Sequence, residues 1–196
     1  MSNTLMRWDL INSYIKKYNF ESFLEIGHAR GIAFGKIDIA VKVSVDPDIT
    51  THPTYAMPSD DFFEKYDAKY DIIFIDGLHE HAQVERDIKH SLARLNQGGV
   101  IVMHDCHPVS EECQRHAFDY PGGAWTGDCW KAFVKCRALL PYEMYVWDHD
   151  WGCGVLDTNI SRMSDVSQLP TIMADLTYAD FAAHPEWMNF KLAIPE

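Results

Sequence analysis

Hydrophobic and polar positions alternate along the chain in a way that predicts strands and helices in turn. Buried strands are predicted by short apolar runs such as SFLEIG, DIIFID and VIVMH. Helices are predicted where apolar residues recur every three or four positions, as in residues 4–18 and in EHAQVERDIKHSLARL. Strands that alternate with helices indicate a mainly parallel sheet with helices on both of its faces.

The last two predicted strands differ from the others, because only HDW separates MYVWD from GCGVLD. Such a short connection fits an antiparallel hairpin. We therefore expect an α/β fold whose sheet has seven strands, five of them parallel, with an antiparallel terminal hairpin. The length of 196 residues fits one domain. The expected parts of this single domain, 1–196, are an N-terminal helix (4–18), a core (20–157), a lid loop (about 105–126) and a C-terminal extension (158–196).

The segment 105–126 lacks periodicity and contains proline, glycine and tryptophan, which predicts a long loop. Loops of this length in compact domains are usually functional or disordered. The aromatic residues Phe118, Tyr120 and Trp125 either close a lid over a substrate or fix the loop to the body of the domain.

Composition narrows the classes of partner. The chain has 29 acidic and 17 basic residues, a net charge of -12, and no cluster of lysine and arginine that could bind phosphates. A nucleic-acid partner is therefore not expected. The five cysteines form no CxxC pair, so reduced thiols are expected rather than a disulfide framework or a zinc knuckle.

The start of the chain does not resemble a signal peptide, because Trp8, Asp9 and Asn12 interrupt any apolar stretch. No apolar run approaches the roughly 20 residues that a membrane span needs. We expect a cytoplasmic protein with no membrane partner.

The first predicted strand runs into LEIGHARG, in which Gly27 and Gly31 lead into a helix. Small residues there allow a ligand to approach the backbone, and a helix N-terminus favours anionic groups. The alternative is a tight turn without a ligand. Glu25, just before the glycines, suits an ammonium group better than a pyrophosphate.

Acidic residues also follow the next two strands. Asp46 comes about 20 residues after the glycine turn, where an acid can accept hydrogen bonds from both hydroxyls of a ribose. Ser59 and Asp60 follow the third segment, where an acid could bind the amino group of an adenine. The alternatives are a strand-end acid at Asp46 and a helix N-cap at Ser59. Together these acids predict a neutral or cationic nucleoside ligand.

The stretch VIVMHDCHP places His104 and Asp105 at the end of a buried strand. Polar residues are common where strands reach water, but open α/β sheets also place their chemistry at the carboxyl ends of strands. Cys106 follows directly. We expect it to be a packed thiol, because no specific cysteine–histidine pair is indicated.

The order FLEIGHARG, VSVD, FIDGLHEH and LNQGGVIVMHD resembles the class I S-adenosylmethionine-dependent methyltransferases. More narrowly, FIDGLH followed by GGVIVMHD resembles the small-molecule O-methyltransferase group that includes the macrocin-type and cephalosporin-hydroxylase-like enzymes. The likeness covers residues 20–157. It implies a Rossmann-like fold, S-adenosylmethionine as the cofactor, and methylation of a hydroxyl on a small molecule or sugar.

The resemblance also implies a set of cofactor-binding residues, with Ala29 standing where glycine is common. These residues are Glu25, Gly27, His28, Gly31, Asp46, Ser59, Asp60 and Asp76.

In related metal-dependent O-methyltransferases, an acid after the fourth strand joins two ligands after the fifth, and these positions match Asp76, His104 and Asp105. A divalent ion there, magnesium, manganese or similar, would lower the pKa of a bound hydroxyl. His104 offers nitrogen where oxygen is usual, which favours manganese, iron or zinc over magnesium.

His79 matches the basic residue that removes the proton in catechol-type enzymes, a task that histidine suits near neutral pH. The expected catalytic residues are thus His79, His104 and Asp105. Two alternatives stay open: that no metal binds and His104 assists His79, or that His79 is a helix cap or supports the site from outside.

Two other classes of protein remain open. An NAD-dependent oxidoreductase is favoured by the glycine turn and Asp46, but the GxGxxG spacing is missing and the terminal hairpin does not fit. A non-catalytic module that binds an adenosyl nucleoside would keep the same strand-end acids. Neither the acceptor nor the oligomeric state follows from the sequence.

Overall fold

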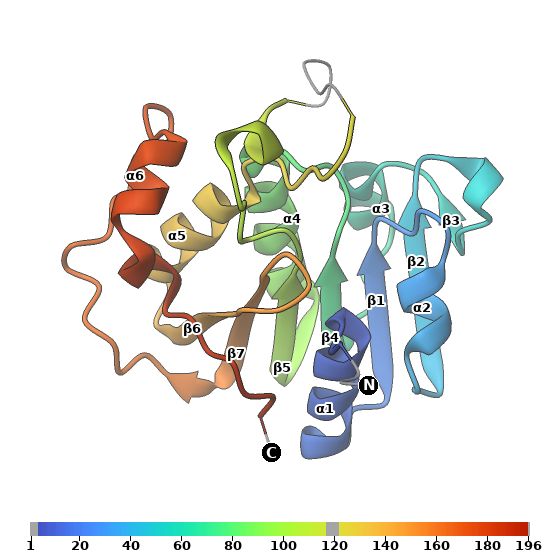
Figure 1. The fold of residues 1–196 in the computed structure, drawn as a ribbon. Coiled ribbons are helices and arrows are strands. Elements are labelled where there is room, and N and C mark those ends of the chain that lie inside the picture. The colour runs from blue at the N-terminus through green and yellow to red at the C-terminus, as the bar shows by residue number, and fades with distance from the viewer. Residues whose placement is uncertain (1–3, 117–121, 196) are drawn as a thin grey trace.

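The computed structural model describes residues 4–116 and 122–195. Seven strands form one sheet in the order β3-β2-β1-β4-β5-β7-β6 (Figure 1). The strands are β1 (Ser22–Ile26), β2 (Val41–Asp46), β3 (Tyr55–Ala56), β4 (Tyr70–Ile75), β5 (Leu95–Met103), β6 (Tyr142–Trp147) and β7 (Cys153–Ser161). β1 to β5 pair in parallel, and β7 runs antiparallel to both β5 and β6. The expected Rossmann-like sheet with its antiparallel hairpin is confirmed.

Helices cover both faces of this sheet (Figure 1). The α-helices are α1 (Arg7–Tyr18), α2 (Ile32–Lys36), α3 (Ser59–Lys65), α4 (His81–Arg94), α5 (Cys129–Leu139) and α6 (Tyr178–Ala183). Short 3-10 helices are η1 (Ile49–Thr51), η2 (Glu111–Gln114) and η4 (Pro185–Met188). α1 and α2 pack on one face, and α3, α4 and α5 pack on the other.

Alternation along each central strand divides the core into these two layers, because successive side chains point to opposite faces. In β4, Ile72 and Phe74 pack against α1, whereas Ile73 and Ile75 pack against α4 and α5. All four side chains are buried. This explains why the strand reads as a continuous apolar run rather than an alternating one.

The boundary between α4 and β5 differs from the prediction that QGG ends a helix before a strand VIVMH. α4 ends at Arg94 and β5 begins at once with Leu95, which pairs with Tyr70 on β4. Gly99 permits this close pairing, because a Cβ there would lie 2.7 Å from the carbonyl oxygen of Asp71. The glycines therefore belong to the strand, and the predicted boundary was wrong.

The C-terminal extension packs on the α5 side of the sheet. Arg137 donates hydrogen bonds from Nη1 to the carbonyl oxygens of Glu186 and Trp187. The helix expected near 185–192 is present only as the short turn η4, while α6 was not predicted. Of the predicted loop 105–126, residues 117–121, with Phe118 and Tyr120, lie outside the described residues.

No helix within residues 4–116 and 122–195 combines the length and the apolar character needed to cross a membrane.

Candidate active site

A cavity of about 680 Å³ lies at the carboxyl ends of the parallel strands. Its lining includes one residue that follows each strand from β3 to β5: Ser59, Asp46, Gly27, Asp76 and Asp105 respectively. The strand order 3-2-1-4-5 therefore becomes an order of side chains along the cavity. This is the position at which open α/β sheets bind ligands.

Gly27 brings the ends of β1 and β4 together. Its φ is 87°, and a Cβ on this residue would lie 2.1 Å from the carbonyl oxygen of Asp76. Glycine is thus required here by the neighbouring strand as well as by any ligand. Gly31 also has a positive φ of 66°, and Ala29, where glycine is common in the related enzymes, adopts 43°.

Glu25 lies beneath the cavity, in contact with the glycine turn. It is 1% exposed, and its Oε2 atom lies 2.8 Å from Nδ1 of His28. Burial, together with the negative charge of Asp76, raises the pKa of Glu25 to about 8. Burial also lowers the pKa of His28. The pair therefore carries little net charge near neutral pH.

Asp46 orders the glycine turn from the end of β2. Its Oδ2 atom accepts hydrogen bonds from the backbone N–H groups of His28 at 2.8 Å and Ala29 at 2.9 Å. Its Oδ1 atom accepts one from the N–H of Asp48 at 2.8 Å. The carboxylate also lines the cavity, so it can meet a ligand while it holds the turn.

Ser59 is the first residue of α3, and Pro58 is its N-cap, so the N-cap prediction for Ser59 was wrong. Its hydroxyl instead donates to Oδ1 of Asp87 at 2.7 Å. Gln83 donates from Nε2 to Ser59 Oγ at 3.2 Å and to Asp87 Oδ1 at 3.1 Å. Asp60 lines the cavity beside this group.

The sequence gave no warning of Gln83 and Asp87, which come from α4. Asp87 is only 1% exposed, and burial raises its pKa. The available signal was two polar residues beside the apolar positions Val84 and Ile88, on the side of α4 that was expected to be buried.

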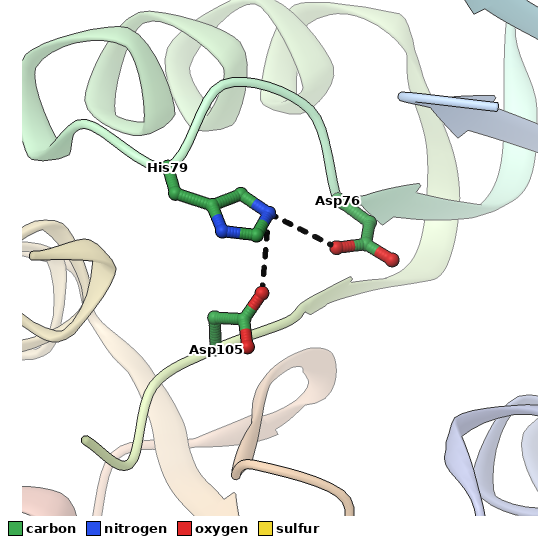
Figure 2. Close-up of side chains that lie close together, drawn as sticks. All are labelled: Asp76, His79 and Asp105. Carbon is green, nitrogen blue, oxygen red and sulfur yellow. Dashed lines mark ion pairs between the residues drawn. The ribbon is translucent and has the colours of Figure 1, made fainter. Parts of the chain in front are cut away.

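Asp76, His79 and Asp105 converge at the other end of the cavity (Figure 2). The Nε2 atom of His79 lies 3.2 Å from Oδ2 of Asp105 and 3.6 Å from Oδ1 of Asp76. One donor atom from each residue lies within 4.8 Å of the other two. Burial opposes a charge on His79, but the two carboxylates raise its pKa overall.

His104 lies deeper than His79, with a side chain only 3% exposed. Its Nδ1 atom is 2.9 Å from Asp105 Oδ2 and 3.3 Å from Asp76 Oδ1, and its Nε2 atom is 3.7 Å from Asp150 Oδ1. Neither ring nitrogen makes a well-oriented hydrogen bond within the described residues. Although burial opposes protonation, the surrounding carboxylates raise the pKa of His104 well above its ordinary value.

All four predicted residues of this cluster are therefore close together, but His79 rather than His104 completes the most compact donor set. Asp105 has a φ of 60°, an uncommon conformation for a residue other than glycine. Such backbone conformations concentrate at functional sites.

Sequence reasoning missed Arg7 and Asp150. Arg7, the first residue of α1, donates from Nη1 to Asp76 Oδ2 at 2.6 Å. It also donates from Nε and Nη2 to the two carboxylate oxygens of Asp150, at 2.8 and 3.1 Å. The partners are 69 and 143 residues away in the chain, so no local pattern could have indicated them.

The end of the long loop holds His79 in place. The His79 ring stacks on Trp125 with centroids 4.5 Å apart, and its Nδ1 atom lies 3.3 Å from the Trp125 carbonyl oxygen. Gly127 packs on the backbone of His79, because a Cβ there would lie 1.7 Å from the His79 carbonyl oxygen. This end of the loop therefore acts as an anchor.

Cys106 is fully buried behind the site. Burial raises the pKa of its thiol, as it does for Cys129 and Cys153. These groups remain protonated at neutral pH, in keeping with packed thiols rather than nucleophiles.

Comparison with known proteins agrees with this geometry. A family model described as a methyltransferase domain matches residues 42–106, about a third of the chain, from β2 to the end of β5. Among curated protein sequences, none matches.

Several solved structures share the fold. A provisionally described caffeoyl-CoA O-methyltransferase from Staphylococcus aureus has a TM-score of 0.57 at 17% identity, covering 82% of this chain and 86% of its own. An O-methyltransferase from Bacillus cereus, in complex with S-adenosylhomocysteine, has a TM-score of 0.55 at 12% identity, with 80% and 84% covered. The O-methyltransferase TomG from Streptomyces achromogenes, in complex with S-adenosylmethionine, has a TM-score of 0.57 at 12% identity, with 80% of each chain covered. At these identities the likeness establishes the fold.

The sheet order and the methyltransferase-domain match together define the class: the chain is an S-adenosylmethionine-dependent methyltransferase. The alternative of an NAD-dependent oxidoreductase is set aside, because the matched segment and the reversed hairpin both belong to the methyltransferase architecture.

Proposed function

We propose that this enzyme transfers the methyl group of S-adenosylmethionine to a hydroxyl group of a small molecule, with assistance from a divalent metal. The observation that carries the proposal is the position of Asp76, His79 and Asp105 in the same cavity as the glycine turn and Asp46. The solved structures of O-methyltransferases with the same fold support it.

The cavity fits the cofactor in size and in the order of its polar groups. A volume of about 680 Å³ lies within the usual range for ligand pockets. Ser59, Asp60 and Gln83 at one end offer hydrogen-bonding groups for an adenine. Asp46 lies next, where a ribose would follow, and the glycine turn and Asp76 come after it for the methionine portion. Bound in this direction, the cofactor supplies an activated methyl group near Asp76.

The acceptor hydroxyl would then lie on the β5 side, against His79 and Asp105. His79 is the proposed base: its Nε2 atom points into the cluster, and Trp125 fixes the plane of its ring. As the oxygen–carbon bond forms and the carbon–sulfur bond breaks, the hydroxyl proton passes to this nitrogen. Positioning by the cavity supplies most of the rate enhancement in such a displacement.

The donor set fits a divalent ion. Asp76 and Asp105 offer oxygen and His79 offers nitrogen, a combination suited to manganese, iron or zinc. Such an ion, when bound, would lower the pKa of the acceptor hydroxyl. His104, beneath both carboxylates, would hold them in place or take one ligand position itself, as the sequence predicts.

The chemical outcome can be tested without knowing the acceptor. The enzyme, manganese and S-adenosylmethionine with a deuterated methyl group are incubated with pooled small-molecule hydroxyl compounds, and labelled products are sought by mass spectrometry. We expect a labelled methyl ether that is absent with His79→Gln. A label on nitrogen or carbon would contradict O-methylation. A protein that binds the cofactor but labels no member of broad acceptor pools would favour the non-catalytic module.

A further inference from the structure

The charged groups of the cavity are unevenly divided. Its lining contains five aspartates, namely Asp46, Asp60, Asp76, Asp87 and Asp105. Arg7 is the only arginine or lysine among the described residues that line it. The methionine portion of S-adenosylmethionine carries an ammonium group and a carboxylate. In a cavity rich in aspartate, the carboxylate needs a cationic partner, because an unpaired anion beside other anions is costly to bury.

Arg7 lies at the methionine end of the cavity. Its Nη1 atom is 2.6 Å from Asp76 Oδ2, and the backbone of Asp76 in turn contacts Gly27 of the glycine turn. The guanidinium group is therefore beside the junction of β1 and β4. The groups proposed for ribose and adenine follow β2 and β3, further from Arg7.

Asp150 holds the guanidinium group in a fixed orientation. It accepts from Nε at 2.8 Å and Nη2 at 3.1 Å, and also from the backbone N–H of Arg7 at 2.9 Å. Because Asp150 has only 3% of its side chain exposed, this contact is shielded from solvent. A clamp of this kind reduces the entropy that Arg7 would lose on binding a ligand.

Two donors of Arg7 remain available. A guanidinium group has five N–H bonds, and the contacts with Asp76 and Asp150 use three of them. The remaining two, one on Nη1 and one on Nη2, have no partner within the described residues. The side chain is 20% exposed and lines the cavity.

From these contacts we propose that Arg7 binds the carboxylate of the methionine portion of the cofactor. This inference rests on the proposed function, since it assigns a residue to one end of the proposed cofactor site. It makes the first turn of α1 part of the binding site and Asp150 a residue that positions Arg7. It also predicts selectivity for ligands that carry the complete amino-acid end.

Three ligands separate this role from a structural one. S-adenosylhomocysteine carries both the ammonium group and the carboxylate. Its decarboxylated analogue keeps only the ammonium group, and 5′-methylthioadenosine has neither. Each is titrated calorimetrically into the wild-type protein, Arg7→Gln, Arg7→Lys and the control Lys16→Gln, which removes an exposed charge from the same helix.

We expect Arg7→Gln to weaken S-adenosylhomocysteine about tenfold or more, in line with the loss of one charge-assisted hydrogen bond. The other two ligands should change much less, and Lys16→Gln should change none. Arg7→Lys should give a smaller loss, again only for the ligand with a carboxylate. If Arg7→Gln does not fold, as judged by circular dichroism, the comparison is made with Arg7→Lys.

Equal losses for all three ligands, or no loss for any, would overturn the role of Arg7. A loss shared by S-adenosylhomocysteine and its decarboxylated analogue would also overturn it, because the effect would then come from Asp76 and the ammonium group. Failure of the wild-type protein to bind any of the ligands would instead contradict the proposed function.

Discussion

The Nε2 atom of His79 lies 3.2 Å from Oδ2 of Asp105, although the two residues follow different strands of the sheet. Asp105 directly follows the His104 that ends VIVMH, and His79 follows β4 in the turn GLHE. Their contact turns two separate sequence motifs into one candidate centre for proton transfer and metal binding. The predictions below test this centre and the glycine turn beside it.

Metal binding at this centre should depend on pH. The carboxylates of Asp76 and Asp105 raise the pKa of His79, so the imidazole holds its proton to a higher pH than usual. A metal must displace that proton, and affinity for manganese should therefore increase as the pH rises through this raised pKa. Electron paramagnetic resonance of free manganese measures the affinity. We expect Asp105→Asn to weaken it at every pH, and an affinity unaffected by pH or by this variant would contradict the site.

Trp125 should matter for the metal and not for the nucleoside. Trp125→Ala removes the surface on which the His79 ring stacks, which frees the ring to rotate. We expect manganese affinity to fall about tenfold, as is typical when support for a metal ligand is lost. Trp125→Phe keeps an aromatic surface and should retain most of the affinity. If binding of S-adenosylhomocysteine fell as much as that of manganese, the indole would support the whole cavity rather than His79.

Gly27→Ala should disrupt the junction of β1 and β4. The added Cβ would meet the Asp76 carbonyl oxygen at 2.1 Å, and the φ of 87° is unfavourable for alanine. We expect a loss of about 2 kcal/mol or more in the free energy of unfolding. The control is Gly35→Ala in α2, where a Cβ meets no atom within 4 Å. That change should be neutral or stabilise by up to about 1 kcal/mol.

Urea denaturation measures both glycine variants. Similar effects of the two substitutions would show that the strand ends are not in the close contact described here.

Glu25 should make the protein less stable as the pH rises. Its pKa in the folded state is about 8, above its ordinary value near 4.5, so the folded protein binds the extra proton between these values. Stability therefore declines from about pH 5 to pH 8 as the unfolded chain loses that proton more readily.

Glu25→Gln mimics the protonated form and can still meet His28. It should match the wild type near pH 5 and exceed it above pH 8, by on the order of 2 kcal/mol. Thermal unfolding across this pH range measures the difference. A constant difference between the two proteins would contradict a buried, protonated Glu25.

Much of the fold could be predicted because its signals are local. Apolar runs identified the strands, and the polar residues at their ends, such as Asp46 and Asp76, converge because parallel strands end at the same edge of the sheet. The α4–β5 boundary could not be predicted in the same way. QGG is a common helix stop, but here Gly99 allows the strand to pass close to Asp71.

The missed site residues share a physical reason. Arg7 begins an amphipathic helix, where a charged residue needs no special explanation, and Asp150 lies in a hairpin turn, where aspartate is common. Only the folded chain brings them to Asp76. Local pattern therefore identified the ends of strands, whereas residues that reach the cavity from helices and turns required the three-dimensional structure.

The central claim is that the cavity at the strand ends binds S-adenosylmethionine, and calorimetric titration of S-adenosylhomocysteine into the metal-stripped protein tests it most directly. The account predicts micromolar affinity, strong weakening by Asp46→Ala, and no comparable binding of NAD. Repeating the titration with manganese should give equal or tighter binding. If NAD binds and S-adenosylhomocysteine does not, or if neither binds with or without manganese, the account of this site is contradicted.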